Sequence, residues 1–340
     1  MSAWLKRDDV RLWLGDSIDV MRQLPAQSVR LICTSPPYWA LRDYGPNGQI
    51  GQEERPEQFL TALWAWADAC HRVLADDGVM VVNLGDKMAG SGGHNNVDLR
   101  SKEERSVPPA RGRLHRNRDV QPYRTAPRSY NRNLGGVPKK SLMMLPHRWM
   151  LGLIAPDAYR LDGADAPSQW LLRQEVIWHK PNPMPESVPD RPHRNHETIF
   201  VLSKNGNHVG ADLDPSIAKS VWTIPTVPLS IPDEAMKRFQ LGGAHYAAFP
   251  PALPRSVIDA WSEPGDVVLD PFLGTGTTVM MARVMGRVGW GIDLNEEYLR
   301  LATWRIFESG DWTTSLEERA LIRAAAGGGV ELLTLFKETA

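Results

Sequence analysis

The sequence predicts an α/β fold, and three observations lead to it. Apolar runs of strand length alternate with segments of helical periodicity over most of the 340 residues. Apolar residues make up 42% and charged residues 23% of the chain, which excludes wholesale disorder. No apolar run approaches the ~18 residues that span a bilayer. At roughly 150 residues per domain, the length allows about two domains, or one large α/β domain with insertions.

The N-terminal quarter contains the first strand and helix signals. Residues 11–14 alternate weakly and stop at a Gly-Asp turn, whereas residues 29–34 form an apolar run that ends at two prolines. Because proline cannot continue a central strand, the backbone must leave the sheet there. Residues 57–74 carry apolar side chains at helical spacing, and Asp77-Gly78 is predicted to stop that helix. Residues 79–84 then predict a buried strand.

The middle of the chain has weaker signals. Residues 88–138 are rich in Gly, Pro, Asn and Arg with little periodicity, which indicates a long loop or small insertion. A helix is expected near residues 141–155. Two strands are expected at residues 174–178 and 198–202, on either side of a proline-rich hairpin. Residues 204–243 carry no strong fold signal.

The C-terminal part shows the clearest alternation. After a helix at 253–261, residues 267–269, 275–285, 288–292 and 296–307 predict strand, helix, strand and helix. Such alternation predicts a parallel sheet that is covered on both faces. The remaining tail predicts one more helix, broken by three glycines.

Charge and cysteine content narrow the class of protein. The formal net charge is −1, yet 13 Lys or Arg and only 4 Asp or Glu lie between Lys87 and Lys140. This asymmetry indicates a basic surface on an acidic body. Two cysteines, Cys33 and Cys70, exclude a disulfide framework and a cysteine-rich zinc site. The first residues have no apolar signal core, so we expect a cytoplasmic protein.

A glycine turn between a strand and a helix indicates a nucleoside site. In VVLDPFLGTGTT, Gly274 and Gly276 let the backbone turn tightly and approach a ligand closely. Asp293 ends the next strand, where a carboxylate can accept hydrogen bonds from two ribose hydroxyls. Val279 replaces the third glycine of a dinucleotide fingerprint, and Asp270 suits an ammonium better than a pyrophosphate. These features favour S-adenosylmethionine on a Rossmann-like sheet; the alternative is a turn that only packs a helix.

A second constellation, TSPPYW, follows the strand at 29–34. Open α/β sheets bind ligands beyond the carboxyl ends of their strands. Two prolines hold a carbonyl and a hydroxyl in place, and Tyr38 offers a flat face for stacking on a base. The alternative is a proline-stiffened turn with structural aromatic residues.

Together these motifs resemble a known family. TSPPYW is similar to the catalytic motif (D/N/S)-P-P-(Y/F/W) of amino-methylating DNA methyltransferases, and DPFLGTGTT resembles their S-adenosylmethionine motif. The catalytic motif comes first, as in the circularly permuted β class. Segments 71–86, 175–204 and 245–270 add further matches, so the resemblance covers roughly residues 10–308. It implies a Rossmann-like S-adenosylmethionine-dependent methyltransferase sheet with a basic loop insertion.

The resemblance also implies an organisation and a set of site residues. The organisation is a catalytic-motif half at residues 1–87, the basic insertion at 88–140, a continued methyltransferase domain at 141–204, a short target-recognition segment at 205–244, a cofactor-binding half at 245–308 and a helical tail at 309–340. The catalytic positions are Ser35, Pro36, Pro37 and Tyr38. The cofactor contacts are Asp16, Asp270, Phe272, Gly274, Gly276, Thr277 and Asp293.

The implied reaction is direct methyl transfer from S-adenosylmethionine to the exocyclic amine of a base flipped out of DNA. Family members whose motif begins with Ser mostly act on N4 of cytosine, and those with Asp or Asn mostly on N6 of adenine. Ser35 therefore favours cytosine N4, with adenine N6 in DNA as the alternative. This chemistry needs no thiol nucleophile, so we expect Cys33 to be a buried small residue.

The expected partner is double-stranded DNA, with a cognate restriction endonuclease as a further candidate and no membrane. In the β class, target recognition usually lies where this chain has only residues 205–244, so we expect the basic insertion to contact DNA. The predicted contacts are Arg111, Arg113, Arg116, Arg118, Arg124, Arg128 and Arg132. The alternative is a solvated loop without a specific role. His193 and His196 lack further candidate ligands, so no metal site is predicted.

Other function classes fit the sequence less well. Methylation of RNA or of a protein amide stays open, because related pockets accept planar amides and amines. A non-catalytic DNA-binding protein conflicts with the intact TSPPYW and FLGTG motifs. A nicotinamide oxidoreductase is disfavoured by the missing third glycine.

Overall fold

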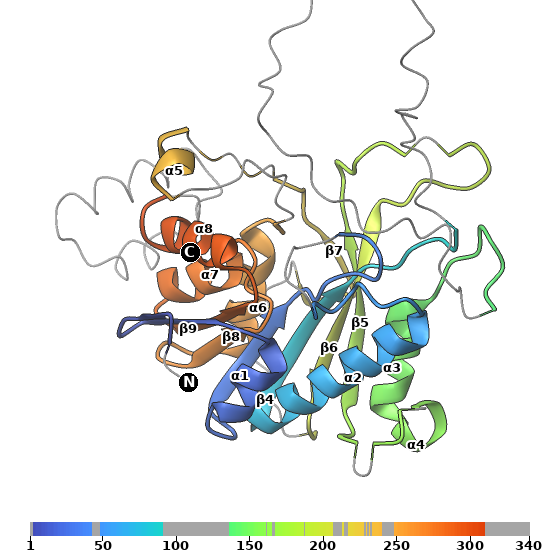
Figure 1. Cartoon of the computed structure of the whole chain (residues 1–340), viewed down its shortest axis with the longest axis horizontal. Coiled ribbons are helices and arrows are strands. Elements are labelled where there is room, and N and C mark those ends of the chain that lie inside the picture. The colour runs from blue at the N-terminus through green and yellow to red at the C-terminus, as the bar shows by residue number, and fades with distance from the viewer. Residues whose placement is uncertain are drawn as a thin grey trace, which may run out of the picture.

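The computed structural model describes residues 3–42, 48–90 and 136–309, except 161, 165–166, 187, 207–212, 214–216, 228, 230, 232 and 240–247. A nine-stranded sheet forms the centre of this part of the chain, in the order β1-β2-β9-β8-β3-β4-β6-β5-β7 (Figure 1). The strands are β1 (Leu5–Lys6), β2 (Val10–Leu14), β3 (Val29–Thr34), β4 (Leu74–Leu84), β5 (Leu171–His179), β6 (His196–Ser203), β7 (Val221–Thr223), β8 (Val267–Asp270) and β9 (Val288–Asp293).

The central strands β2, β9, β8, β3 and β4 are parallel to one another, as predicted. The sheet as a whole is mixed, because β6 pairs antiparallel with both β4 and β5, and β1 pairs antiparallel with β2. β5 and β6 are antiparallel because the connection of residues 180–195 returns the chain at the same edge of the sheet, where the N–H of Lys180 donates to the carbonyl of Asn195 at 2.7 Å. The Rossmann-like expectation is therefore confirmed for the five central strands.

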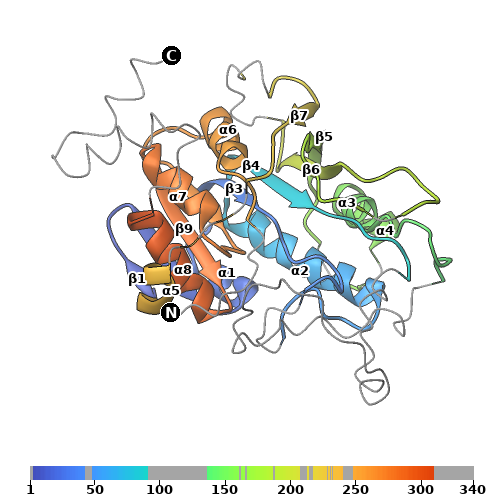
Figure 2. The ribbon, with the colours of Figure 1, turned by 90° about the horizontal axis from the view of Figure 1, so that it is seen from above.

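Helices cover both faces of the sheet. They are α1 (Ser17–Gln23), α2 (Pro56–Val73), α3 (Leu145–Ile154), α4 (Pro156–Tyr159), α5 (Asp233–Arg238), α6 (Ala252–Trp261), α7 (Thr277–Val284) and α8 (Glu296–Phe307). One apolar cluster joins α1, α2 and α3 to the sheet, and another joins α6, α7 and α8 to it. Figure 2 shows α3 and α4 at one end and α5 and α8 at the other. No helix in the described residues has the length and apolar character needed to cross a bilayer.

The two clusters follow from strand alternation. In β3, Ile32 belongs to the cluster beneath α2, whereas Leu31 and Cys33 belong to the cluster beneath α6. Successive strand residues point to opposite faces, so a strand that is covered on both sides must be apolar throughout. VRLICT has this composition, with five of its six residues buried.

Two predictions about elements need correction, and one stretch without a clear signal contains two short elements. Strand β4 begins at Leu74 rather than 79, because Leu74 pairs with Val29 across the Asp77-Gly78 signal. Helix α3 begins at Leu145 rather than 141, where Asp86 accepts the backbone N–H groups of residues 144 and 145. The stretch 204–243 contains β7 and α5, two elements too short to produce a clear periodic pattern.

The sheet brings distant parts of the sequence to one edge. Parallel strands β2, β9, β8, β3 and β4 end there, and antiparallel β6 begins there. The order also reverses between β8 and β3, since β3 leads to β4 on one side and β8 leads to β9 on the other. Ligands of open α/β sheets bind at such a switch point.

Candidate active site

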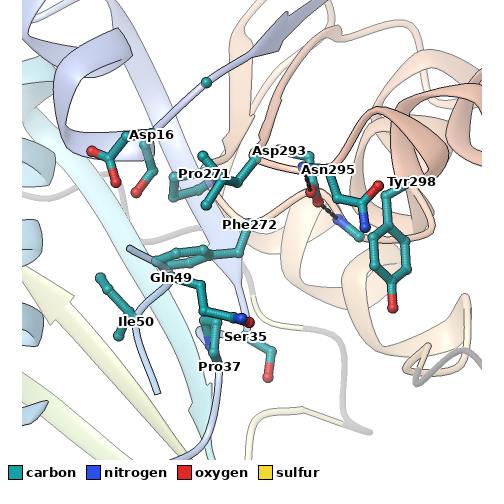
Figure 3. A pocket seen from close by; sticks show the side chains of 14 residues that line it. Asp16, Ser35, Pro37, Gln49, Ile50, Pro271, Phe272, Asp293, Asn295 and Tyr298 are labelled. Carbon is teal, nitrogen blue, oxygen red and sulfur yellow. Dashed lines mark hydrogen bonds between the residues drawn. The ribbon is translucent and has the colours of Figure 1, made fainter. Parts of the chain in front are cut away.

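A first pocket lies at the switch point, beyond the ends of β2, β3, β8 and β9 (Figure 3). It encloses about 770 Å³ including its open mouth, within the range of ligand pockets. The labelled lining residues are Asp16, Ser35, Pro37, Gln49, Ile50, Pro271, Phe272, Asp293, Asn295 and Tyr298. Apolar and aromatic walls with a few carboxylates suit a nucleoside with a flat base and hydroxyl groups.

Asp293 provides the main charged group of this pocket. One carboxylate oxygen accepts the backbone N–H of Gly274 at 2.8 Å, and the other accepts the N–H of Asn295 at 2.8 Å. Burial nevertheless raises the pKa of Asp293 to about 7, and the nearby charge of Asp270 adds to the effect. A carboxylate has about four acceptor positions, so both oxygens can still accept hydroxyl groups from a ligand.

Asp16 enters the same pocket from the end of β2. Its Oδ1 also accepts the N–H groups of Ile18 and Asp19, at 2.9 and 3.1 Å, and thereby caps α1. This cap explains why a short helix begins directly after the Gly-Asp turn.

A second pocket adjoins the first. Ser35, Phe272 and Gly274 line both pockets, so these residues form a shared wall. The second pocket encloses about 1150 Å³ and is also lined by Pro36 and Tyr38 from the TSPPYW segment. Two ligands placed in these pockets would meet at Ser35.

A hydrogen-bonded network closes one side of the second pocket. The hydroxyl of Tyr38 donates to Glu197 at 2.7 Å, and the side-chain amide of Asn83 donates to the same carboxylate oxygen at 2.8 Å. The ammonium of Lys180 bonds to the other oxygen of Glu197. Ser35 Oγ lies 3.4 Å from the Tyr38 hydroxyl. The network therefore fixes the tyrosine ring beside Ser35.

Glu197 is ionised within this network. Burial opposes its charge, but Lys180 and the donors Tyr38 and Asn83 outweigh burial and hold the pKa of Glu197 below its usual value. Lys180 also lies over the ring of Trp178, 4.3 Å from the ring centroid. The second pocket thus has an aromatic wall beside a paired carboxylate, whereas Oδ1 of Asn83 is buried without a hydrogen-bond partner among the described residues.

Gly85 makes room for the tyrosine. A Cβ at this position would lie 2.2 Å from Cε2 of Tyr38, which no real contact allows. Tyr38 therefore packs directly on the backbone just after β4. Neighbouring Trp39 is buried, and its indole N–H donates to the carbonyl of Glu53 at 3.0 Å.

Asp270 lies behind the shared wall. Its carboxylate accepts the hydroxyl of Thr34 at 2.6 Å and the N–H of Phe272 at 3.2 Å. Burial raises the pKa of Asp270 to about 6, against the lowering effect of these hydrogen bonds. The structure places this residue on the second pocket rather than the first.

Comparison with known proteins identifies the family. The model of a DNA methylase family, N6_N4_Mtase, matches residues 29–303. The chain belongs to this family. It is 38% identical to the type II methyltransferase M.XycI of Xanthomonas campestris pv. cyanopsidis, over 87% of each chain. It is 36% identical to the type II methyltransferase M.Cfr9I of Citrobacter freundii, over 89% of each chain.

Solved structures of DNA methyltransferases share this fold. The PvuII cytosine-N4-specific DNA methyltransferase superposes with a TM-score of 0.59 at 20% identity, covering 96% of this chain and 95% of its own. A Thermus thermophilus protein complexed with S-adenosyl-L-methionine gives a TM-score of 0.53 at 24% identity, over 87% and 92%. Membership of the family makes this chain an S-adenosylmethionine-dependent DNA methyltransferase, which confirms the expected fold and cofactor.

The residues of the first pocket fit that cofactor. Asp293 offers free acceptor positions for ribose hydroxyls, and Phe272, Ile50 and Pro37 offer apolar surface for an adenine ring. The bound cofactor supplies an activated methyl group on a sulfonium centre. Gly274 has a φ of +50°, a conformation that favours glycine, and this turn carries the loop after β8 along the pocket wall.

Arg305 supports that loop from behind. Its buried guanidinium on α8 donates to the carbonyl of Thr275 at 2.9 Å and to the hydroxyl of Thr277 at 2.8 Å. Gly276 lines neither pocket. Its φ is +80°, and a Cβ there would lie 2.7 Å from the Cβ of Ala302, so this glycine lets α7 approach α8.

The predicted site residues fall into three groups: those that line one or both pockets, those that line neither, and those outside the described residues. Asp16, Ser35, Pro37, Phe272, Gly274 and Asp293 line the first pocket, and Ser35, Pro36, Tyr38, Asp270, Phe272, Gly274 and Thr277 line the second. The seven predicted DNA-contacting arginines, from Arg111 to Arg132, lie outside the described residues. Cys33 is buried as predicted, and burial raises the pKa of its thiol. The described residues contain no cluster of His, Cys, Asp and Glu suited to a metal.

Sequence reasoning missed Asn83, Glu197 and the pairing role of Lys180. Each stands near a strand end at the edge that holds Ser35: Asn83 in β4, Glu197 in β6 and Lys180 just after β5. The predicted hairpin implies an antiparallel β5–β6 pair. To place these residues beside Ser35, however, one must also know that β6 pairs with β4, which the sequence pattern alone does not provide.

Proposed function

We propose that this methyltransferase modifies the N4 amine of cytosine in double-stranded DNA, as a type II enzyme. The observation that carries the proposal is Ser35, the first residue of the SPPY tetrad within TSPPYW, on the wall shared by the two pockets. The methyl donor would occupy the first pocket and the flipped base the second. The type II assignment rests on the relatives M.XycI and M.Cfr9I.

The residues around Ser35 have separate tasks in this proposal. Ser35 Oγ and the carbonyl of Pro36 accept hydrogen bonds from the target amine, which localises its lone pair toward the methyl donor. Tyr38 stacks on the base, and its own hydroxyl is held by Glu197. Such positioning of two reactants supplies a large share of the rate. The base must leave the duplex because its amine is otherwise paired.

The basic insertion supplies DNA affinity in this proposal. Its arginines neutralise phosphates, and a subset reads guanine edges. Replacing Arg111, Arg113, Arg116 and Arg118 with alanine is expected to weaken DNA binding and to flatten its salt dependence. Unchanged affinity across a salt series would refute this part of the proposal.

The decisive experiment identifies the methylated nucleoside. The purified protein is incubated with labelled S-adenosylmethionine and unmethylated genomic DNA, and the DNA is digested to nucleosides. Label in N4-methylcytosine is expected, and sequencing of the same DNA then gives the recognition site. Label in N6-methyladenine would overturn the choice of base while keeping the family and the mechanism.

Variants test whether Ser35 acts at the amine. Ser35→Ala is expected to lower the single-turnover rate by about 10- to 100-fold, as loss of a positioned hydrogen bond does, with cofactor affinity changed little. Ser28→Ala is the matched control, because this serine lies outside both pockets and donates to the carbonyl of Pro25. Equal rates for Ser35→Ala and Ser28→Ala would contradict the role of Ser35.

A further inference from the structure

Apolar side chains stand exposed at the mouth of the second pocket. Met184 is 87% exposed, the highest value among the large apolar side chains of the described residues. Leu41, which is 54% exposed, lines the same pocket from the segment after TSPPYW. Val227 is 49% exposed and follows Thr226, another lining residue. Exposed apolar groups that gather at one opening indicate a binding surface.

Hydrogen bonds tie the segment that carries Met184 to a second loop. The segment belongs to the connection between β5 and β6, which extends beyond the strand ends (Figure 1). Asn182 ties it to Thr226, donating from Nδ2 to the Thr226 carbonyl at 2.9 Å and accepting the Thr226 N–H at 2.8 Å. Pro183 and Pro185 flank Met184 and restrict its backbone. The exposed position of this side chain is therefore built into the fold.

We propose that Met184 is a wedge that enters the DNA base stack and takes the place of the flipped target base. The proposal rests on the proposed function, which puts that base in the pocket beneath. A base that leaves the stack exposes its neighbours, and proteins offset this cost by inserting apolar side chains such as Met, Leu or Phe. The methionine side chain is flexible and polarisable, and it has no strong hydrogen-bonding group to bury, so it can pack against either flanking base.

The position of Met184 fits this task better than a packing role. Nearly all of its surface is open, so it contributes little to the core. It lines the same pocket as Tyr38 and Lys180, two members of the network beside Ser35. Leu41 comes from a different segment of the same pocket lining, and a duplex seated over the opening would contact both apolar residues.

The test compares two DNA duplexes that contain the recognition site found by sequencing. In one the target base is paired normally; in the other the opposing nucleotide is abasic, so that flipping breaks no base pair. Met184→Ala is expected to lower the single-turnover rate by at least roughly tenfold on the paired duplex and by less than about threefold on the abasic duplex. The larger loss is expected where the wedge offsets the cost of opening the base pair and unstacking the target base. Met184→Leu is expected to retain the wild-type rate on both.

A control variant isolates the effect of the wedge. Met144→Ala removes a methionine that is 42% exposed and lines neither pocket, and it is expected to change neither rate. Equal losses of Met184→Ala on the two duplexes, or no loss on the paired duplex, would overturn the wedge. A wild-type protein that methylates no DNA would instead refute the proposed function, so the two failures are distinguishable.

Discussion

Cofactor affinity should depend on pH through Asp293. Burial raises the pKa of this carboxyl to about 7, and ribose hydroxyls bind its ionised form as hydrogen-bond donors. Binding therefore favours the deprotonated state, so affinity rises as pH rises through 7 and a proton is released on binding at lower pH. With a pKa of about 7, the ionised fraction grows from about 10% at pH 6 to about 90% at pH 8, which predicts roughly tenfold tighter binding.

Calorimetric titration with S-adenosylhomocysteine at pH 6, 7 and 8 measures this dependence. Asp293→Asn is expected to flatten it and to weaken binding at every pH, because an amide offers the ribose hydroxyls one acceptor oxygen instead of two. The variant is also expected to destabilise the fold, because both carboxylate oxygens accept backbone N–H groups and an amide NH₂ must face one of them. An unsatisfied buried donor costs about 1–3 kcal/mol. Asp19→Asn, an exposed change outside both pockets, is the control. A pH dependence that Asp293→Asn leaves unchanged would refute the reasoning.

Three further changes test the fold and the chemistry. Gly276→Ala should destabilise the protein by about 1–3 kcal/mol in urea denaturation, because the new Cβ meets Ala302 at 2.7 Å; a wild-type midpoint would contradict this contact. Arg160→Met should lower the free energy of unfolding by about 3–5 kcal/mol in the same assay, because it removes the buried guanidinium that pairs with Asp68 and Asp162. A loss below about 1 kcal/mol would contradict this expectation. Cys33→Ala should leave the methylation rate unchanged, and loss of activity in a folded variant would point to thiol chemistry.

Much of the fold could be predicted because the central strands are covered on both sides. Their apolar runs and the intervening helices give a strong local signal, so β3, α2, α6, β8, β9 and α8 lie within three residues of their predicted bounds. The elements whose bounds were predicted wrongly or not at all are set by contacts between segments that are distant in sequence. Leu74 pairs with Val29 although Asp77-Gly78 signals a turn, and β7 has only three residues, paired with Ile177 and its neighbours in β5. Pairing across the sheet outweighs local preference in both places.

Site residues could be predicted from the sequence where a single short segment contains the whole motif. TSPPYW and DPFLGTGTT each include a strand end and a turn, so their residues could be placed from the sequence. Glu197 could not, since its role depends on Tyr38, Asn83 and Lys180, which approach it from three other segments. Gly276 also needs the fold to be interpreted, because the motif alone does not reveal that this glycine packs against α8.

The electrostatics of the three buried carboxylates distinguish the two pockets. Glu197 already has a cation, Lys180, and its pKa lies below the usual value, so this carboxylate needs no charged ligand. Burial raises the pKa values of Asp270 and Asp293 to about 6 and about 7. A ligand with positive sulfonium and ammonium groups would stabilise both ionised carboxylates, whereas a pyrophosphate would raise their pKa values further. Asp293 in the first pocket would therefore favour the cationic S-adenosylmethionine over a dinucleotide, which agrees with the absence of a third glycine at Val279.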